Sequence, residues 1–221
     1  MIKKSIVFFL FVTMIMSFAL ATYAKGTMSP IPSLDQIDSY RVDYSDAYIE
    51  LFDLTSSNLD ELMGNSDAIV LAKTEDTGIP KAFSIQKKIQ IVKCLKGDLS
   101  DTAILYEPVR IFWDNSLVSY MGYLPMIKGH TYLLFLRKNE NIQGHKEIYY
   151  PVAGDIGKFE EGKRASMSLI ETPYEQAKEN ACYVYDDTFF KYTGQERIDI
   201  YNRIYEEIME RDLFHYTQGH N

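Results

Sequence analysis

The chain has 221 residues, and its 31 acidic against 23 basic side chains give it a formal charge of −8. A negative field of this size repels phosphate backbones, which excludes nucleic acid as an expected partner and leaves peptides, proteins, cationic polymers and sugars compatible. The length suits one domain with a substantial core and is too short for two independent ones.

The first two dozen residues have the order of a secretion signal. Lys3 and Lys4 precede an apolar run from Ser5 to Ala21 that no acidic residue interrupts. Cleavage can follow Ala21 or Ala24, and we expect it after Ala24, which leads into a stretch with Gly, Ser and Pro. An uncleaved anchor is the alternative, because the run is close to the length that spans a bilayer. We therefore expect a secreted or extracytoplasmic protein, with membrane contact only through this segment if it is retained.

Four segments are expected along the chain. Residues 1–24 are the signal peptide or anchor, and residues 25–55, which contain two prolines, are an irregular lead-in or spacer. Residues 56–160 form a β-barrel domain, and residues 161–221 form a C-terminal extension whose helix packs on the barrel.

The barrel domain begins with a short helix and continues with strands. Ser56 or Ser57 can cap the helix, acidic residues occupy its first turn, and Gly64 is expected to end it. Short apolar runs or alternating patterns then predict five strands. They lie at residues 68–72, 83–91, 102–106, 131–136 and 147–152. Five successive strands with turn signals between them favour a small antiparallel barrel that is closed or partly open.

The C-terminal helix is expected at residues 194–212. Thr193 to Glu196 form a capping box, and the residues that follow at helical spacing make an apolar stripe. The stripe consists of Ile198, Tyr201, Ile204, Tyr205 and Ile208. Such a stripe must be covered, and the nearest candidate is an edge or end of the barrel.

Four segments of the barrel region carry a family resemblance. They are Asn65–Lys73, Ile91–Asp98, Lys128–Leu136 and Gly154–Phe159. Read in order, they resemble secreted bacterial domains similar to the netrin-like, tissue-inhibitor-of-metalloproteinase type of OB-fold. The resemblance covers about residues 59–160 and implies a mainly β fold: a five-stranded OB-like barrel with flanking helices, one before the first strand and one at the C-terminus.

The inhibitory chemistry of that family does not transfer to this chain. Animal inhibitors of this type bind a protease zinc through the amino group and carbonyl of an N-terminal cysteine. The residues that follow the two cleavage sites here are Thr22 and Lys25. Metalloprotease inhibition is therefore not expected, whereas binding of a peptide or protein remains compatible with the barrel.

The sequence offers no motif for catalysis, a metal or a cofactor. Its histidines, His130, His145, His215 and His220, are scattered and lack zinc-site spacing. Nucleophile elbows and phosphate-binding glycine loops are also missing. We therefore expect a protein that is not an enzyme and that uses no cofactor.

One segment has the composition of a binding loop. Residues 110–125 bring together Phe112, Trp113, Tyr120 and Tyr123, and aromatic-rich loops on barrels often hold peptides or sugars. The alternative is an additional hairpin whose aromatic side chains close the barrel.

The two cysteines, Cys94 and Cys182, leave two interpretations open. Export permits a disulfide between them, and each can equally be a small buried apolar residue.

These patterns favour an exported, non-catalytic binding protein of the cell envelope or extracellular space, whose partner is a peptide, a protein or an envelope polymer. Two alternatives from other classes are an exported hydrolase with an unrecognised site and a protective, immunity-type protein that sequesters a cationic peptide.

Overall fold

The computed structural model describes part of the chain. The described residues are 13–17, 34–45, 56–112, 114–120, 122–139, 148–154, 156–165, 173, 175–176 and 194–215. The chain divides into one unit up to Pro32 and a larger unit from Ser33. In the first unit residues 13–17 are helical, and within the described residues no helix is long and apolar enough to cross a membrane. Most of the expected signal segment lies outside the described residues, so export stays a prediction.

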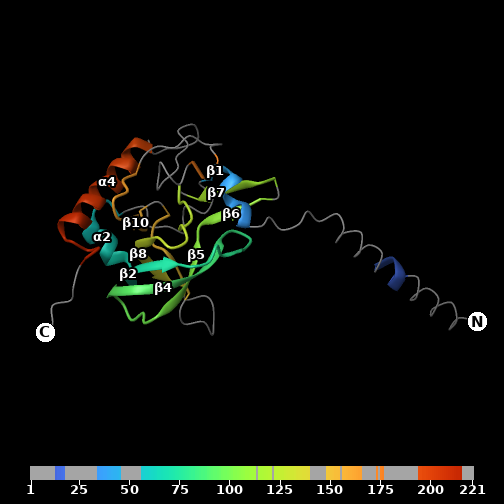
Figure 1. The fold of residues 1–221 in the computed structure, drawn as a ribbon, viewed down its shortest axis with the longest axis horizontal. Helices are drawn as coiled ribbons and strands as arrows, with labels where there is room; N and C mark the ends of the chain where they lie inside the picture. Colours follow the sequence, from blue (N-terminus) through green and yellow to red (C-terminus); the bar gives the residue numbers. More distant parts are fainter. Residues whose placement is uncertain are drawn as a thin grey trace, which may run out of the picture. The chain divides into compact units, whose positions relative to one another are not determined.

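Five strands of the larger unit close into a barrel (Figure 1). They are β2 (Ala68–Thr74), β4 (Ile85–Lys96), β5 (Thr102–Glu107), β8 (Thr131–Lys138) and β9 (Ile148–Pro151). The strands pair in the order β8, β2, β4, β5, β9, and pairing of β9 with β8 closes the ring. Two short strands extend the sheet: β3 (Ile79–Pro80) pairs with β4, and β10 (Lys158–Glu160) pairs with β8. The predicted five-stranded OB-like barrel is confirmed.

One pairing in the ring differs from the antiparallel barrel that the sequence predicted. β5 and β9 run parallel, whereas the other four pairs of the ring are antiparallel. The reason is geometric: five strands are an odd number, so strand directions cannot alternate all the way around a closed ring. The barrel is therefore mixed.

The burial of each strand explains its sequence pattern. β2 and β8 are buried on both faces, which is why they read as continuous apolar runs. Their even-numbered residues face the barrel interior, and their odd-numbered residues face the helices. In β4 and β5, buried residues alternate with more exposed ones, as expected for strands with one face toward solvent.

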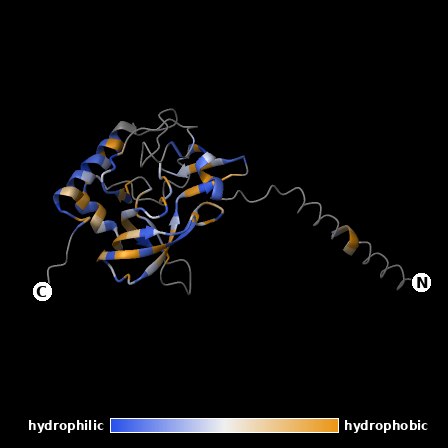
Figure 2. Ribbon diagram, viewed as in Figure 1, coloured by the Kyte–Doolittle hydropathy of each residue, from blue (hydrophilic) through white to orange (hydrophobic). Residues whose placement is uncertain are grey.

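Two helices cover one side of the barrel. α2 (Leu59–Asn65) and α4 (Gly194–Glu210) lie side by side in Figure 1 and share one apolar cluster with β2, β8 and β10. The predicted stripe of α4 is buried in this cluster, and the alternation of hydrophobic and hydrophilic residues along the helix can be followed in Figure 2. Polar contacts also join the helices, since Leu59 N donates to Glu207 Oε2 at 3.0 Å and Arg203 Nη2 donates to Ser57 O at 2.6 Å.

Both ends of α2 differ from the expectation. Asn58, and not a serine, is the N-cap: its Oδ1 accepts from Glu61 N at 3.0 Å, and Glu61 Oε2 accepts from Ser57 N at 2.7 Å. The helix continues through Gly64 to Asn65. Ser66 Oγ donates to Leu62 O at 2.7 Å, which satisfies one carbonyl of the last turn without a glycine stop.

A second, smaller sheet lies beside the barrel. It contains β1 (Arg41–Ser45), β7 (Ser116–Tyr120) and β6 (Val109–Ile111) in that order, with β1 parallel to β7. A 3₁₀ helix, η1 (Leu34–Ser39), precedes β1. Part of the expected irregular lead-in is therefore ordered. Its strand is short and pairs with a segment more than 70 residues away, a partner that local patterns cannot identify.

Two glycines permit close approaches between segments of the barrel. Gly97 has a φ of +92°, and a Cβ there would lie 2.9 Å from Asp67 O. A Cβ on Gly157 would lie 2.5 Å from Ala153 O. Any larger residue at these positions forces the backbone to shift.

Candidate functional site

Two charged side chains point into the barrel from adjacent strands. Lys87 on β4 and Glu107 on β5 occupy the inward phase of their strands, with side chains 3% and 0% exposed. Lys87 Nζ lies 2.9 Å from Glu107 Oε2. That oxygen has no conventional hydrogen-bond donor in the described structure, so the ion pair is what compensates its burial.

The buried pair holds the segment 122–127, which follows β7. Glu107 Oε1 accepts from Tyr123 OH at 3.0 Å and from Met126 N at 2.6 Å, while Lys87 Nζ donates to Met126 O. Ser119 Oγ donates to Tyr123 O at 2.8 Å. Buried side chains thus form hydrogen bonds with backbone groups of this segment that are not paired with a strand. Polar backbone groups in a protein interior need such partners.

A second buried lysine supports the same segment. Lys158 Nζ donates to Leu124 O and lies 4.3 Å from the ring centroid of Tyr123 and 5.1 Å from that of Tyr132. Tyr132 OH accepts from Ile127 N at 3.0 Å. Burial, followed by the negative charges of Glu160 and Glu107, raises the pKa of the Tyr132 hydroxyl well above its usual range, so the phenol stays neutral.

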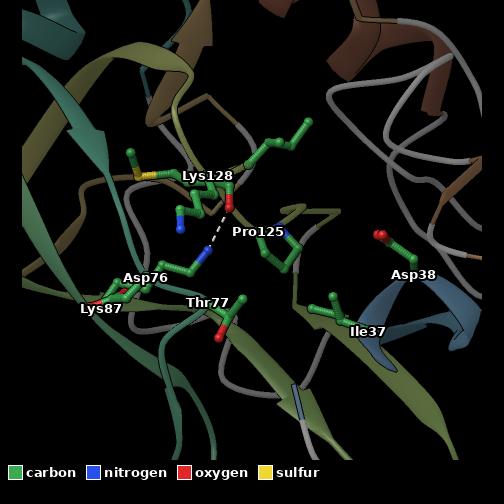
Figure 3. Close-up of a pocket in the computed structure, with 9 residues that line it drawn as sticks. Ile37, Asp38, Asp76, Thr77, Lys87, Pro125 and Lys128 are labelled. Atoms are coloured by element: carbon green, nitrogen blue, oxygen red, sulfur yellow. Dashed lines mark hydrogen bonds between the residues drawn. The ribbon is translucent and has the colours of Figure 1, made fainter. Parts of the chain in front are cut away.

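A small cavity of about 150 Å³ adjoins this network (Figure 3). Lys87, Thr77, Asp76 and Asp38 line it together with apolar residues of the segment 122–127. The Lys87 ammonium donates to Met126 O in the hydrogen bond drawn as a dashed line in Figure 3, so this charged group of the cavity wall already has a backbone partner. The network is best explained as structural: it fixes a segment whose Met126 packs in the barrel interior and whose Tyr123 and Leu124 pack with residues of the second sheet.

A different feature lies on the surface, where two hairpins bring aromatic rings to one guanidinium. Arg110 Cζ lies 5.1 Å from the ring centroid of Phe83 and 4.2 Å from that of Phe112. Phe83 is 49% exposed, and Ile79, on the same hairpin as Phe83, is 56% exposed. We call Ile79, Phe83, Arg110 and Phe112 the hairpin surface.

Local turns set the position of these side chains. Phe83 lies in the connection between β3 and β4, where Lys81 N donates to Ser84 O at 2.8 Å. Phe112 follows β6 and begins the turn into β7, where Phe112 N donates to Ser116 O at 2.9 Å. Asp114 Oδ1 accepts from Ser116 Oγ and N, and the hydrogen bond from the Ser116 hydroxyl is the main cause that lowers the pKa of Asp114.

The structure divides the predicted binding loop. Phe112 belongs to the hairpin surface, and Trp113 lies outside the described residues. Tyr120 and Tyr123 are only 5% and 2% exposed, and Tyr123 is a member of the buried network, so neither reaches a ligand at the surface. β6 and β7 pair as a hairpin that belongs to the second sheet and not to the barrel.

The remaining candidate residues are placed as follows. Cys94 Sγ lies 3.2 Å from Lys96 O, and Cys182 lies outside the described residues, so their disulfide stays a prediction. His130 Nδ1 lies 2.8 Å from Glu160 Oε1, and His215 Nδ1 lies 3.1 Å from Asp212 Oδ1. His145 and His220 lie outside the described part of the chain, within which no three potential metal-ligating side chains gather.

Sequence reasoning missed Lys87, Glu107, Phe83 and Arg110. A signal existed for the first two, because each is a charged residue in the inward phase of an otherwise alternating strand. Phe83 is two residues before Ile85, so an alternating pattern would place both side chains on the same buried face. Phe83 precedes the strand, however, and outside a strand the alternation no longer determines where a side chain points. The partnership of Arg110 with two rings depends on tertiary contact between two hairpins.

No protein-family model matches the chain, and the comparison with curated proteins finds no match. What the protein does is therefore inferred from its own geometry.

Proposed function

We propose that this protein is an exported, non-catalytic binding protein of the cell envelope or extracellular space and that it holds a peptide segment on the hairpin surface. The observation that carries the proposal is the exposure of Phe83 beside Arg110, which also contacts Phe112, together with exposed Ile79 on the same hairpin as Phe83. Large apolar side chains gathered on the surface, with an arginine among them, have the composition of a protein-binding centre.

The framework beneath this surface supports such a role. In an antiparallel sheet, directly opposed residues project from the same face, and Ile79 opposes Gln86, which in turn opposes Tyr106. This row continues from β3 across β4 and β5. A ligand on the hairpin surface would therefore rest on barrel strands, which are more rigid than an isolated loop.

Two finer parts of the proposal rest on the sequence. The four motifs that resemble the netrin-like OB-fold type favour a relationship at the level of fold, without the zinc-binding cysteine of the animal inhibitors. The N-terminal apolar segment favours export. N-terminal sequencing of protein recovered outside the cytoplasm distinguishes cleavage after Ala24, cleavage after Ala21 and retention.

The binding site is tested with surface variants and a random heptapeptide library. We expect the wild-type chain to enrich peptides from the library, and Phe83→Ala and Phe112→Ala each to weaken binding of the enriched peptides by about tenfold or more, since buried aromatic contacts dominate binding energy. Trp113→Ala, the neighbouring predicted contact, is measured in parallel. Fluorescence anisotropy with labelled peptides gives the dissociation constants.

The matched control is Val92→Ala, which shortens an exposed apolar side chain that lies on β4, outside the hairpin surface. We expect it to bind like the wild type, and circular dichroism should be the same for all variants. Equal losses in Val92→Ala and Phe83→Ala, or no enriched peptide at all, would contradict the proposal.

A second candidate, sequestration of a cationic peptide, has one observation in its favour. A surface hollow of about 500 Å³ is lined by Glu75, Asp76 and Asp101, with Lys88 as its cationic member. Enrichment of peptides rich in lysine and arginine, whose binding depends on these carboxylates and not on Phe83, would favour this function over the first.

A further inference from the structure

The guanidinium of Arg110 is held in an unusual way for a surface arginine. Rings from two separate hairpins, Phe83 and Phe112, contact it within 5.1 and 4.2 Å. Aromatic rings attract the guanidinium electrostatically and cover part of its surface from water. Its five N–H donors lie in the guanidinium plane, and an aromatic ring offers them no conventional acceptor.

Within the described part of the chain, no carboxylate lies at ion-pair distance from this guanidinium. The carboxylate of the neighbouring turn, Asp114, is held by Ser116 and lies 3.9 Å from Arg41. Arg110 is thus a partly buried cation whose contacts are with rings, in a protein with an excess of acidic residues. Partial removal of water increases what a carboxylate acceptor would contribute there.

We infer that Arg110 is the anchor for a carboxylate of the bound peptide. The carboxylate would accept two hydrogen bonds from the guanidinium fork, and an adjacent apolar side chain of the peptide would pack on Phe83 and Ile79. This inference rests on the proposed function and adds the chemistry of the ligand. Two sources supply the same group: an Asp or Glu side chain, and the free C-terminus of a peptide.

The negative net charge of the protein limits the number of carboxylates that the expected ligand can carry. Lys81, which is exposed on the Phe83 hairpin, adds a second positive charge, whereas the whole chain carries −8. A local positive spot in a negative field favours a ligand with one carboxylate at the right position and disfavours a polyanion. We therefore expect a short motif of one acidic group beside apolar residues.

The experiment uses the full chain, in detergent if the N-terminal segment is retained, and two random heptapeptide libraries, one with free and one with amidated C-termini. We expect enriched peptides to carry a carboxylate next to an apolar residue. Replacement of that group by its amide, Glu→Gln or an amidated C-terminus, should weaken binding by about tenfold or more. Which replacement has this effect identifies the source of the carboxylate.

Variants of Arg110 then test the pairing directly. Arg110→Gln should weaken binding of the acidic peptide by about tenfold or more and leave binding of its amide form nearly unchanged. Arg110→Lys keeps the charge but loses the planar fork, so its loss should be intermediate. Lys81→Gln is the charge control and should change mainly the salt dependence of binding.

Two results overturn the inference and differ from failure of the proposed function. In the first, peptides bind and depend on Phe83, but no carboxylate is enriched. In the second, Arg110→Gln weakens the acidic and amide forms equally. If the wild type enriches no peptide from either library, the proposed function itself fails and this inference fails with it.

Discussion

Replacing Glu107 with alanine is expected to lower the free energy of unfolding by about 3–5 kcal/mol, because it leaves a buried ammonium without its counter-charge. Lys87 is 3% exposed and lies 2.9 Å from the carboxylate. The same change removes the acceptor for Met126 N and Tyr123 OH. Urea unfolding followed by circular dichroism measures the loss.

Two further variants separate charge from hydrogen bonding. Glu107→Gln keeps an acceptor oxygen for Met126 N but leaves Lys87 charged, so it should be less stable than the wild type. Adding Lys87→Met to Glu107→Gln removes both charges and should recover at least half of that loss, since neutral replacements of buried ion pairs are often well tolerated. A double variant as unstable as Glu107→Gln alone would contradict this explanation. Glu75→Gln, on the surface, should change stability by less than about 0.5 kcal/mol.

The second large effect is expected at the junction of barrel and helices. Phe159 on β10 is fully buried, and its ring meets Phe135 edge-on at 5.8 Å and Tyr201 of α4 at 4.6 Å between centroids. Phe159→Ala should lower the free energy of unfolding by about 3–5 kcal/mol, since it removes these contacts and leaves a cavity. The same urea experiment measures it.

The control for this change is Phe83→Ala, which makes the same substitution at a position 49% exposed. It loses the contact with Arg110 at a half-exposed position and should cost less than about 1 kcal/mol. Equal destabilisation by the two variants would contradict the placement of α4 on the barrel. A stable Phe83→Ala protein also makes its effect on binding interpretable.

The barrel strands were predictable from the sequence because the order of apolar and polar residues in each strand reflects which of its faces are buried. β2 and β8 are covered on both faces and are continuously apolar, while β4 and β5 alternate. The apolar stripe of α4 was predictable for the same reason, because the spacing of residues within the helix alone determines it. The relative direction of the strands could not be predicted in this way, because the parallel pair β5–β9 results from closure of the whole ring.

Features that depend on distant contacts were not predictable in the same way. β1 owes its existence to β7, more than 70 residues later. Tyr120 and Tyr123 looked like candidates for a binding loop because composition does not say which face of a hairpin is covered; the packing of η1, β1 and the segment 122–127 decides it. Phe83 and Arg110 entered the candidate site only when two hairpins were brought together.

The central claim is that the hairpin surface, and not the barrel interior, contacts the ligand. Site-specific photocross-linking tests it most directly: a benzophenone amino acid is placed at Phe83 or, as control, at Val92, both exposed positions. We expect that, in the cells that produce the protein, irradiation yields a discrete adduct from position 83 and none from position 92. We also expect Phe112→Ala to abolish the adduct. Equal adducts at both positions, or none at position 83, would contradict the central claim.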